Sequence, residues 1–223
     1  MMTSNLKKCP LFNGVEENEI KPLLDCLRAV NRNYQKDEFI FRADNKAESV
    51  GIVLSGGAYV IQEDFWGNRA ILSHVSPGGL FAEAFSCAQT ERLPVSVIAA
   101  EKSEILLIDY RKIVTVCSAA CVFHSRLIAN MVTVLADNNI KLTRKLEYIS
   151  KRTTREKILS FLSAQAIEAK SRAVTVPFNR QQLADYLCVE RSALSRELSK
   201  MQNEGLLKFV KNNFFLSKNI PEH

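Results

Sequence analysis

Two arginines and two serines lie close together near the end of the chain, in the stretch "CVERSALSRELSKM" at residues 188–201. In a helix, Leu194 and Leu198 share the inner face. The outer face then carries Arg191, Ser192, Ser195 and Arg196. Guanidinium groups form paired hydrogen bonds with guanine O6 and N7, and serine hydroxyls bind bases or phosphates. The pattern predicts a DNA-reading helix over 191–203. The alternative is an amphipathic helix with a solvated basic face.

The segments around this helix are those of a small DNA-binding domain. A capping box at Thr153 and Glu156 starts a helix, "AVTVPF" is a short strand, and "NRQQLADYL" is a second helix. The hairpin "LLKFVKNNFFLS" follows the DNA-reading helix. Helix, strand, two helices and hairpin in series predict a winged helix-turn-helix at 151–223. The residues expected at the phosphate backbone are Asn179, Arg180, Gln181, Lys208 and Lys211.

The distribution of charge supports a nucleic-acid partner. Residues 1–150 hold 17 Lys and Arg against 17 Asp and Glu, whereas residues 151–223 hold 13 against 7. The whole excess of +6 therefore lies in the last third of the chain. Such asymmetry is typical of nucleic-acid binding, although a basic face with no partner gives the same totals.

The first 115 residues predict a β structure. Segments such as "SVGIVLSG", "AYVIQEDF" and "EILLIDY" are rich in β-branched and aromatic residues and are separated by turn-forming residues. Short strands at this spacing indicate a sandwich or barrel, with a hairpin at Trp66-Gly67-Asn68. Because the rest of the chain is predicted to be mainly helical, we expect a fold of the α+β class.

Residues 116–150 predict one long helix, since neither Gly nor Pro interrupts them. Apolar residues alternate by three and four along it, as in a coiled-coil seam. We expect this seam to pair with a second copy in a two-fold dimer. The alternative is packing against the chain's own core. The predicted seam residues are Ile128, Met131, Leu135, Asn138, Leu142 and Ile149.

Nearly the whole chain resembles the family of the cyclic-AMP receptor protein and FNR. The resemblance rests on "NRQQLADYLCVERSALSRELSKMQNEGLL", "TTREKILSFL", "SVGIVLSGGAYV" and "SPGGLFAEAFS". It implies a homodimeric bacterial transcription regulator with an effector-sensing double-stranded β-roll at 1–115, a dimerisation helix at 116–150 and the DNA-binding domain at 151–223. It also implies binding to a palindromic site on double-stranded DNA, and contact with RNA polymerase if the protein is an activator.

The resemblance places Arg191, Ser192 and Arg196 at the three main base-reading positions. The middle position is a glutamate in both named branches, so Ser192 predicts a different half-site. Cys188 stands where the family has a turn glycine. Because cysteine is strained at positive φ, either the turn differs or the strain is tolerated.

The effector is expected to be a small molecule other than cyclic AMP. The family's cyclic-AMP site needs an Arg-Ser pair after Glu83, and "CAQTERLPVSVIAAE" has none. An iron–sulfur cluster is not expected because only Cys9 and Cys26 lie near the N-terminus. Haem, with His74 or His124 as ligand, and a redox or metal pair at Cys117 and Cys121 are disfavoured alternatives. The expected pocket walls are Phe81, Glu83, Phe85, Met131, Val134 and Asn138.

Other classes of protein are less consistent with the sequence. No apolar run approaches the roughly 18 residues of a membrane span, and no signal peptide is recognisable, so we expect a cytoplasmic protein. A metal-dependent enzyme with a cupin-like barrel would need clustered ligands, whereas the three histidines are dispersed. No catalytic or metal site is predicted. A ligand-binding adaptor that never touches DNA would not need the basic reading face.

Overall fold

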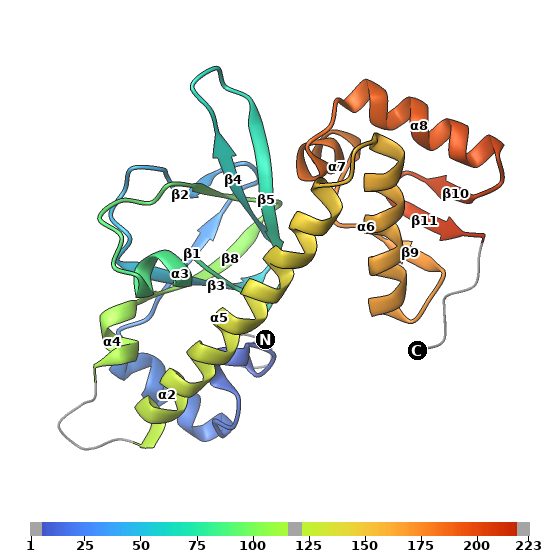
Figure 1. The fold of residues 1–223 in the computed structure, drawn as a ribbon. Helices are drawn as coiled ribbons and strands as arrows, with labels where there is room; N and C mark the ends of the chain where they lie inside the picture. Colours follow the sequence, from blue (N-terminus) through green and yellow to red (C-terminus); the bar gives the residue numbers. More distant parts are fainter. Residues whose placement is uncertain (1–5, 116–121, 218–223) are drawn as a thin grey trace. The chain divides into compact units, whose positions relative to one another are not determined.

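A computed structural model describes residues 6–115 and 122–217 of the chain. The chain forms two compact units, Met1–Asn139 and Ile140–His223. The boundary between them falls inside the long helix α5 (Val122–Ile149), so this helix contributes to both units (Figure 1). Cys117 and Cys121 lie outside the described residues.

In its described part, the first unit is a β-roll of two antiparallel four-stranded sheets. Their strand orders are β1-β8-β3-β6 and β2-β7-β4-β5. The strands are β1 (Val30–Tyr34), β2 (Phe39–Phe41), β3 (Ser49–Ser55), β4 (Ala58–Glu63), β5 (Arg69–Val75), β6 (Leu80–Phe81), β7 (Ser96–Ala99) and β8 (Ser103–Asp109). The helical segments are η1 (Pro10–Phe12), α2 (Glu17–Cys26), α3 (Glu83–Cys87), α4 (Tyr110–Val114) and the first part of α5.

The β-rich sequence segments "EFIFRA", "SVGIVLSG", "AYVIQEDF", "AILSHVSP", "VSVIAAE" and "EILLIDY" correspond to β2, β3, β4, β5, β7 and β8, which confirms the predicted roll. The two-residue strand β6 was not predicted. Strand β1 was not predicted, because its sequence VNRNY is polar and mostly exposed. The predicted hairpin joins β4 to β5, with Gly67 at φ +81°.

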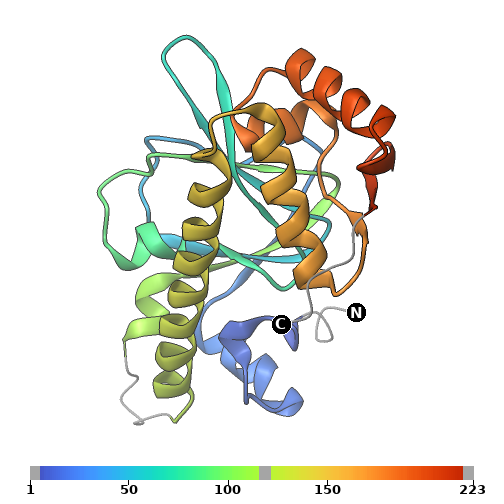
Figure 2. The same cartoon turned by 45° about the vertical axis from the view of Figure 1, so that its right-hand side comes forward.

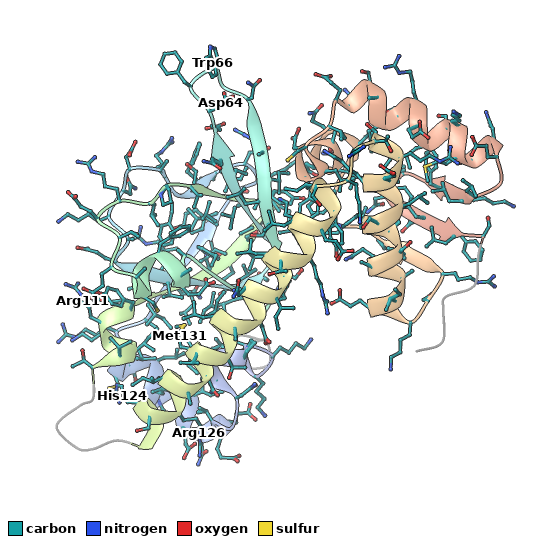
Figure 3. The ribbon with its side chains drawn as sticks, viewed as in Figure 1. Asp64, Trp66, Arg111, His124, Arg126 and Met131 are labelled. Atoms are coloured by element: carbon teal, nitrogen blue, oxygen red, sulfur yellow. The ribbon has the colours of Figure 1, made fainter. Side chains whose placement is uncertain are left out.

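The β4–β5 hairpin projects from the roll, as the two views in Figures 1 and 2 show. Its turn is tied together by Asp64, whose Oδ1 accepts from the amides of Trp66 and Asn68. Trp66 stands at the tip with 82% of its surface exposed (Figure 3). The Phe65 and Trp66 rings make a T-shaped contact with centroids 5.9 Å apart.

One apolar cluster of the roll includes Val53, Phe81, Val97 and Ile105. Phe81 is buried and makes an edge contact with Phe41, at 5.6 Å between ring centroids. Gly51 is required opposite it, since a Cβ there would lie 2.0 Å from the Phe81 ring. Glycine in β3 thus makes room for an aromatic side chain.

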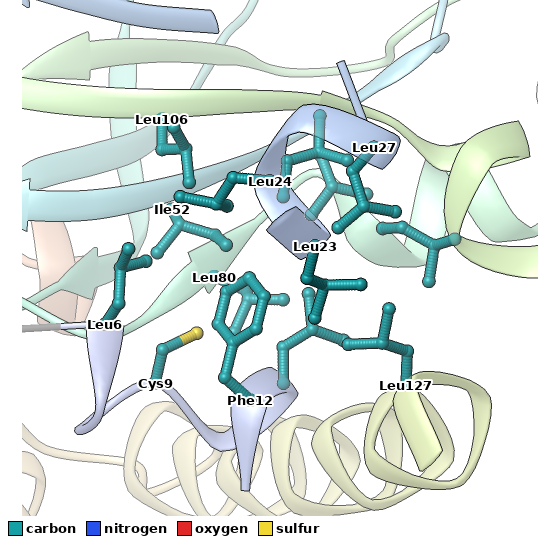
Figure 4. Close-up of a cluster of buried hydrophobic side chains, with 14 of the residues drawn as sticks. Leu6, Cys9, Phe12, Leu23, Leu24, Leu27, Ile52, Leu80, Leu106 and Leu127 are labelled. Atoms are coloured by element: carbon teal, nitrogen blue, oxygen red, sulfur yellow. The ribbon is translucent and has the colours of Figure 1, made fainter. Parts of the chain in front are cut away.

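A second apolar cluster joins strands β3, β6 and β8 to η1, α2 and the first part of α5 (Figure 4). Its α5 members are Leu127, Met131 and Val134. Asn130 adds polar contacts, because its Nδ2 donates to the carbonyls of Leu11 and Asn13, both at 2.9 Å. One face of α5 is therefore part of its own chain's core.

The second unit has the predicted order of elements. They are α6 (Thr154–Ala169), β9 (Ala173–Thr175), α7 (Arg180–Leu187), α8 (Arg191–Asn203), β10 (Leu207–Val210) and β11 (Asn213–Leu216), with sheet order β10-β11-β9. The capping box of Thr153 and Glu156 is present at the start of α6. After α8, Gly205 adopts φ +73°, as expected just beyond a helix end. The unit is a winged helix-turn-helix.

Candidate nucleic-acid interface and effector region

Helices α7 and α8 pack through the predicted apolar faces. Leu183, Ala184 and Leu187 of α7 are buried, as are Leu194, Leu198 and Met201 of α8. This packing fixes which side of α8 faces outward.

The turn between these helices keeps a left-handed residue although its sequence has no glycine there. Cys188 ends α7 with φ 52° and ψ 57°. The turn is held by the Val189 amide, which donates to the Ala184 carbonyl at 3.0 Å. Left-handed backbone geometry costs a residue with a Cβ about 1–2 kcal/mol. The turn therefore does not differ from the expected left-handed one, and the chain tolerates the strain at Cys188.

The predicted reading residues lie on the outer side of α8. Arg191, Ser192 and Arg196 are exposed and Ser195 is half-buried. Within the described chain, neither Arg191 nor Arg196 forms an ion pair. A shallow, open hollow of about 600 Å³ is lined by Ser195, Arg196, Ser199, Lys200, Asn203 and Glu204. Two guanidinium groups are thus free to bind a partner.

Helix α8 is fixed to α6 by a three-residue ion cluster that the sequence did not predict. Arg155 Nη1 lies 3.3 Å from Glu197 Oε1 and 3.1 Å from Glu204 Oε1, and its Nη2 binds Glu204 Oε2. The hydrogen bond from Arg155 lowers the pKa of Glu204. No local pattern reveals such pairs, because their members are 42 and 49 residues apart.

The side chains expected to hold phosphate at the start of α7 have partners within the second unit. Asn179 Oδ1 accepts from the Gln182 amide at 3.0 Å, and Gln182 Oε1 accepts from the Asn179 amide at 2.8 Å. Gln181 Nε2 donates to Asp185 Oδ1 at 2.8 Å. The Arg180 guanidinium lies against the β10–β11 hairpin, whereas Lys208 and Lys211 on this hairpin are exposed.

The predicted walls of the effector pocket divide between the two apolar clusters of the first unit. Phe81 and Phe85 belong to one, and Met131 and Val134 to the other. A direct contact joins Glu83 to Asn138, with Asn138 Nδ2 2.7 Å from Glu83 Oε1. Glu83 is only 6% exposed, and its Oε2 has no hydrogen-bond partner within the described residues. The Glu83 carboxylate is therefore buried beside α5, and one of its two oxygens accepts no hydrogen bond from the described residues.

The residues of the predicted seam differ in burial along α5. Met131 is 4% exposed and packs in its own chain's core, and Asn138 is engaged by Glu83. Ile128, Leu135 and Ile149 are half-buried, and Leu142 is exposed. Val132 and Leu146, which lie outside the six predicted seam positions, are each 62% exposed. We call the apolar residues beside this buried face the exposed α5 stripe: Ile128, Val132, Leu135, Leu142 and Leu146. Of these, Ile128 and Leu135 are only half-buried, and Leu135 also packs against the chain's own core.

The histidines considered as haem ligands lie in different surroundings. The His74 ring of β5 lies tilted against the Tyr59 ring, with centroids 5.1 Å apart, and burial lowers the pKa of His74. His124 of α5 is buried, and its Nδ1 has no hydrogen-bond partner among the described residues (Figure 3). Across 6–115 and 122–217, no three His, Cys, Asp or Glu side chains are grouped to hold a metal ion. None of the helices in these ranges is long and apolar enough to cross a membrane.

A β-roll followed by a long helix and a winged helix-turn-helix is the architecture of a one-chain sensor and DNA-binding protein. The family model for a cyclic nucleotide-binding domain matches residues 31–120, and that for a Crp-like helix-turn-helix domain matches residues 156–218. The chain belongs to the family of the cyclic-AMP receptor protein and FNR. It is thus a transcription regulator with a DNA-binding helix-turn-helix and an effector-binding domain.

Individual relatives are distant. The transcriptional activator protein FnrA of Stutzerimonas stutzeri is 24% identical over 190 residues, which cover 83% of this chain and 75% of that protein. The solved structure of FixK2 from Bradyrhizobium japonicum covers 85% of this chain and 93% of its own, with 21% identity and a TM-score of 0.68. The c-di-GMP responsive regulator CLP of Xanthomonas campestris covers 92% and 100%, with 19% identity and a TM-score of 0.75. These structures share the fold.

Proposed function

We propose that the protein is a homodimeric, effector-gated regulator that reads a palindromic DNA site with α8. The observation that carries this proposal is the outer face of α8, where Arg191 and Arg196 are exposed on a helix whose inner leucines are buried. The Arg155 cluster holds that helix in place. A rigid helix with outward cations suits docking in the major groove.

Pairing of two chains would proceed through the exposed α5 stripe. Its members follow one another at intervals of four, three, seven and four residues, which is a heptad pattern. Two copies related by a two-fold axis would bury these apolar side chains against each other. They would also present two copies of α8 to a site with matching two-fold symmetry.

The effector is proposed to be a small molecule other than cyclic AMP. The absence of an Arg-Ser pair after Glu83 leaves a cyclic phosphate without its charge-assisted contacts. Equilibrium dialysis with cyclic AMP and cyclic GMP, and native mass spectrometry of freshly purified protein, test this. Stoichiometric binding of a cyclic nucleotide, or a retained haem, would establish one of the alternatives instead.

The function as a whole is tested by a mobility-shift titration with the DNA upstream of the protein's own operon. We expect sequence-dependent binding whose affinity falls steeply with salt, because phosphate contacts release counterions. Candidate effectors are added to shift the affinity, since a ligand changes DNA binding only by its differential affinity for the two states. Salt-insensitive binding, or none on any upstream DNA, would contradict the proposal. As an activator, the protein would also contact RNA polymerase.

A further inference from the structure

Arg180, the first residue of α7, extends its side chain onto the β10–β11 hairpin, which we call the wing. Its guanidinium carbon lies 4.9 Å from the ring centroid of Phe209 and 5.7 Å from that of Phe214. Arg180 Nη2 also donates to the Lys211 carbonyl at 3.3 Å. The charged group therefore contacts both strands of the wing and its turn.

The two rings form a platform for this guanidinium. Phe209 and Phe214 are directly paired across the two strands, with ring centroids 5.9 Å apart. Phe214 is buried and Phe209 is half-buried. Planar guanidinium groups stack favourably on aromatic faces. Burial lowers the pKa of Arg180, as expected for a cation partly removed from water.

The turn that Arg180 holds is the part of the wing that carries an exposed lysine. Lys211 adopts φ 55°, and its carbonyl is the acceptor for Arg180. The next residue, Asn212, is fixed to the segment that follows β9, because its Nδ2 donates to the Val176 carbonyl at 2.9 Å. A two-stranded hairpin is only marginally stable alone, so such anchors decide where its tip points.

We propose that Arg180 is a positioning residue that clamps the wing, so that Lys211 meets the DNA backbone, rather than a phosphate contact itself. This inference rests on the proposed function for the role of Lys211. A guanidinium that bound phosphate would have to leave both rings and the carbonyl. The clamp instead keeps these contacts in the complex, and the wing lysines supply the charge.

Salt dependence of DNA binding separates a clamp from a contact. Each lost phosphate contact reduces the slope of log K against log salt by about 0.9. We expect Arg180→Met to reduce this slope by the amount of at least one lost phosphate contact. The double variant Arg180→Met/Lys211→Met should have the same slope as Arg180→Met alone. A further drop of a full contact in the double variant would overturn the clamp. Arg180→Met combined with Arg196→Met is the control pair, whose effects on affinity should multiply.

Phe209→Leu provides a variant that leaves every charge in place. The clamp predicts that it also lowers the salt slope, because the platform is lost and the wing tip moves. An unchanged slope in Phe209→Leu, with a lost contact in Arg180→Met, would show that Arg180 itself touches phosphate.

Amide hydrogen exchange of the full-length chain tests the clamp without DNA. In Arg180→Met, the amides at residues 207–216 should exchange faster, while those of α6 should not change. Equal exchange in wild type and variant would refute the clamp. If wild type fails to bind any DNA, the proposed function fails, and the exchange experiment still decides whether Arg180 holds the wing.

Discussion

Asn138 of α5 donates to the buried carboxylate of Glu83 at 2.7 Å, and this bond joins the roll to the helix expected to form the dimer. A buried acceptor that loses its donor costs about 1–3 kcal/mol. We therefore expect Asn138→Ala to lower the free energy of unfolding by that amount in urea titrations. The double variant Glu83→Ala/Asn138→Ala should cost less than the sum of the two single variants. Additive losses would show that the pair is not coupled.

Arg196→Ala tests the reading face of α8. If the guanidinium binds a base edge, the variant should lose about 1–3 kcal/mol of binding free energy and accept more than one base at a single position. Binding-site selection from a randomised DNA pool measures this directly. Lys170→Ala, which removes a cation at the C-cap of α6, is the control and should keep the selected sequence. Uniform weakening on all sequences would identify Arg196 as a phosphate contact.

The two faces of α5 should respond differently to substitution. Val132→Asp places a charge in the exposed α5 stripe and should shift the chain from dimer to monomer in sedimentation equilibrium, while each chain stays folded by circular dichroism. Met131→Ala instead opens a cavity in the chain's own core and should cost about 2–5 kcal/mol of stability. If Val132→Asp leaves a dimer intact, pairing does not use this stripe.

The strain at Cys188 predicts an unusual order of substitutions. Glycine adopts φ near 52° without steric cost, whereas alanine keeps the Cβ. Cys188→Gly should therefore be more stable than Cys188→Ala by about 1 kcal/mol in thermal or urea unfolding. Equal stabilities would mean that the turn relaxes when its side chain changes.

Lys145 predicts a specific pH dependence of stability. It is buried beneath the Tyr186 ring, with Nζ 4.2 Å from the centroid, and burial lowers its pKa from 10.5 to about 8. Between these two values the Lys145 side chain binds more protons in the unfolded chain than in the folded one, so its contribution to stability should rise with pH above about 8. Below pH 8 the full cost of burying the charged Lys145 ammonium group, on the order of 3 kcal/mol of unfolding free energy, is present.

Lys145→Met should therefore be more stable than wild type at pH 7 and should flatten the rise between pH 8 and 9.5. Urea unfolding followed by circular dichroism at several pH values measures both effects. The range stops at 9.5 because burial raises the pKa of Cys9 and of Tyr186, each to about 12. These groups act with the opposite sign, from about pH 9 for Cys9 and from about pH 10 for Tyr186, in wild type and variant alike. If the unfolding free energy of Lys145→Met rises with pH as steeply as that of wild type, another group causes the pH dependence.

The sequence was informative where a local pattern determines the structure. Strands rich in β-branched residues, the Thr153 capping box and the order of elements around α8 were all predicted correctly. Strand β1 was missed because its residues are polar, and it exists through pairing with β8.

Long-range contacts explain what the sequence did not show. On α5, the sets Leu127, Met131, Val134 and Ile128, Val132, Leu135 both fit helical spacing. Packing against η1 and α2 buries Leu127, Met131 and Val134, whereas Ile128 and Leu135 are half-buried and Val132 is exposed. The Arg155 cluster and the Arg180 stack likewise join residues that are far apart in the chain. Such pairs leave no periodic signal.

Trp66 is the single tryptophan of the chain, and its ring is exposed to solvent in a turn that the hydrogen bonds of Asp64 stabilise. Its intrinsic fluorescence therefore reports on one place only, the tip of the β4–β5 hairpin. In the free protein its emission should be that of an indole in water and should be readily quenched by iodide. Any effector, second chain or other protein that covers this tip should shift the emission to shorter wavelength, with no label attached.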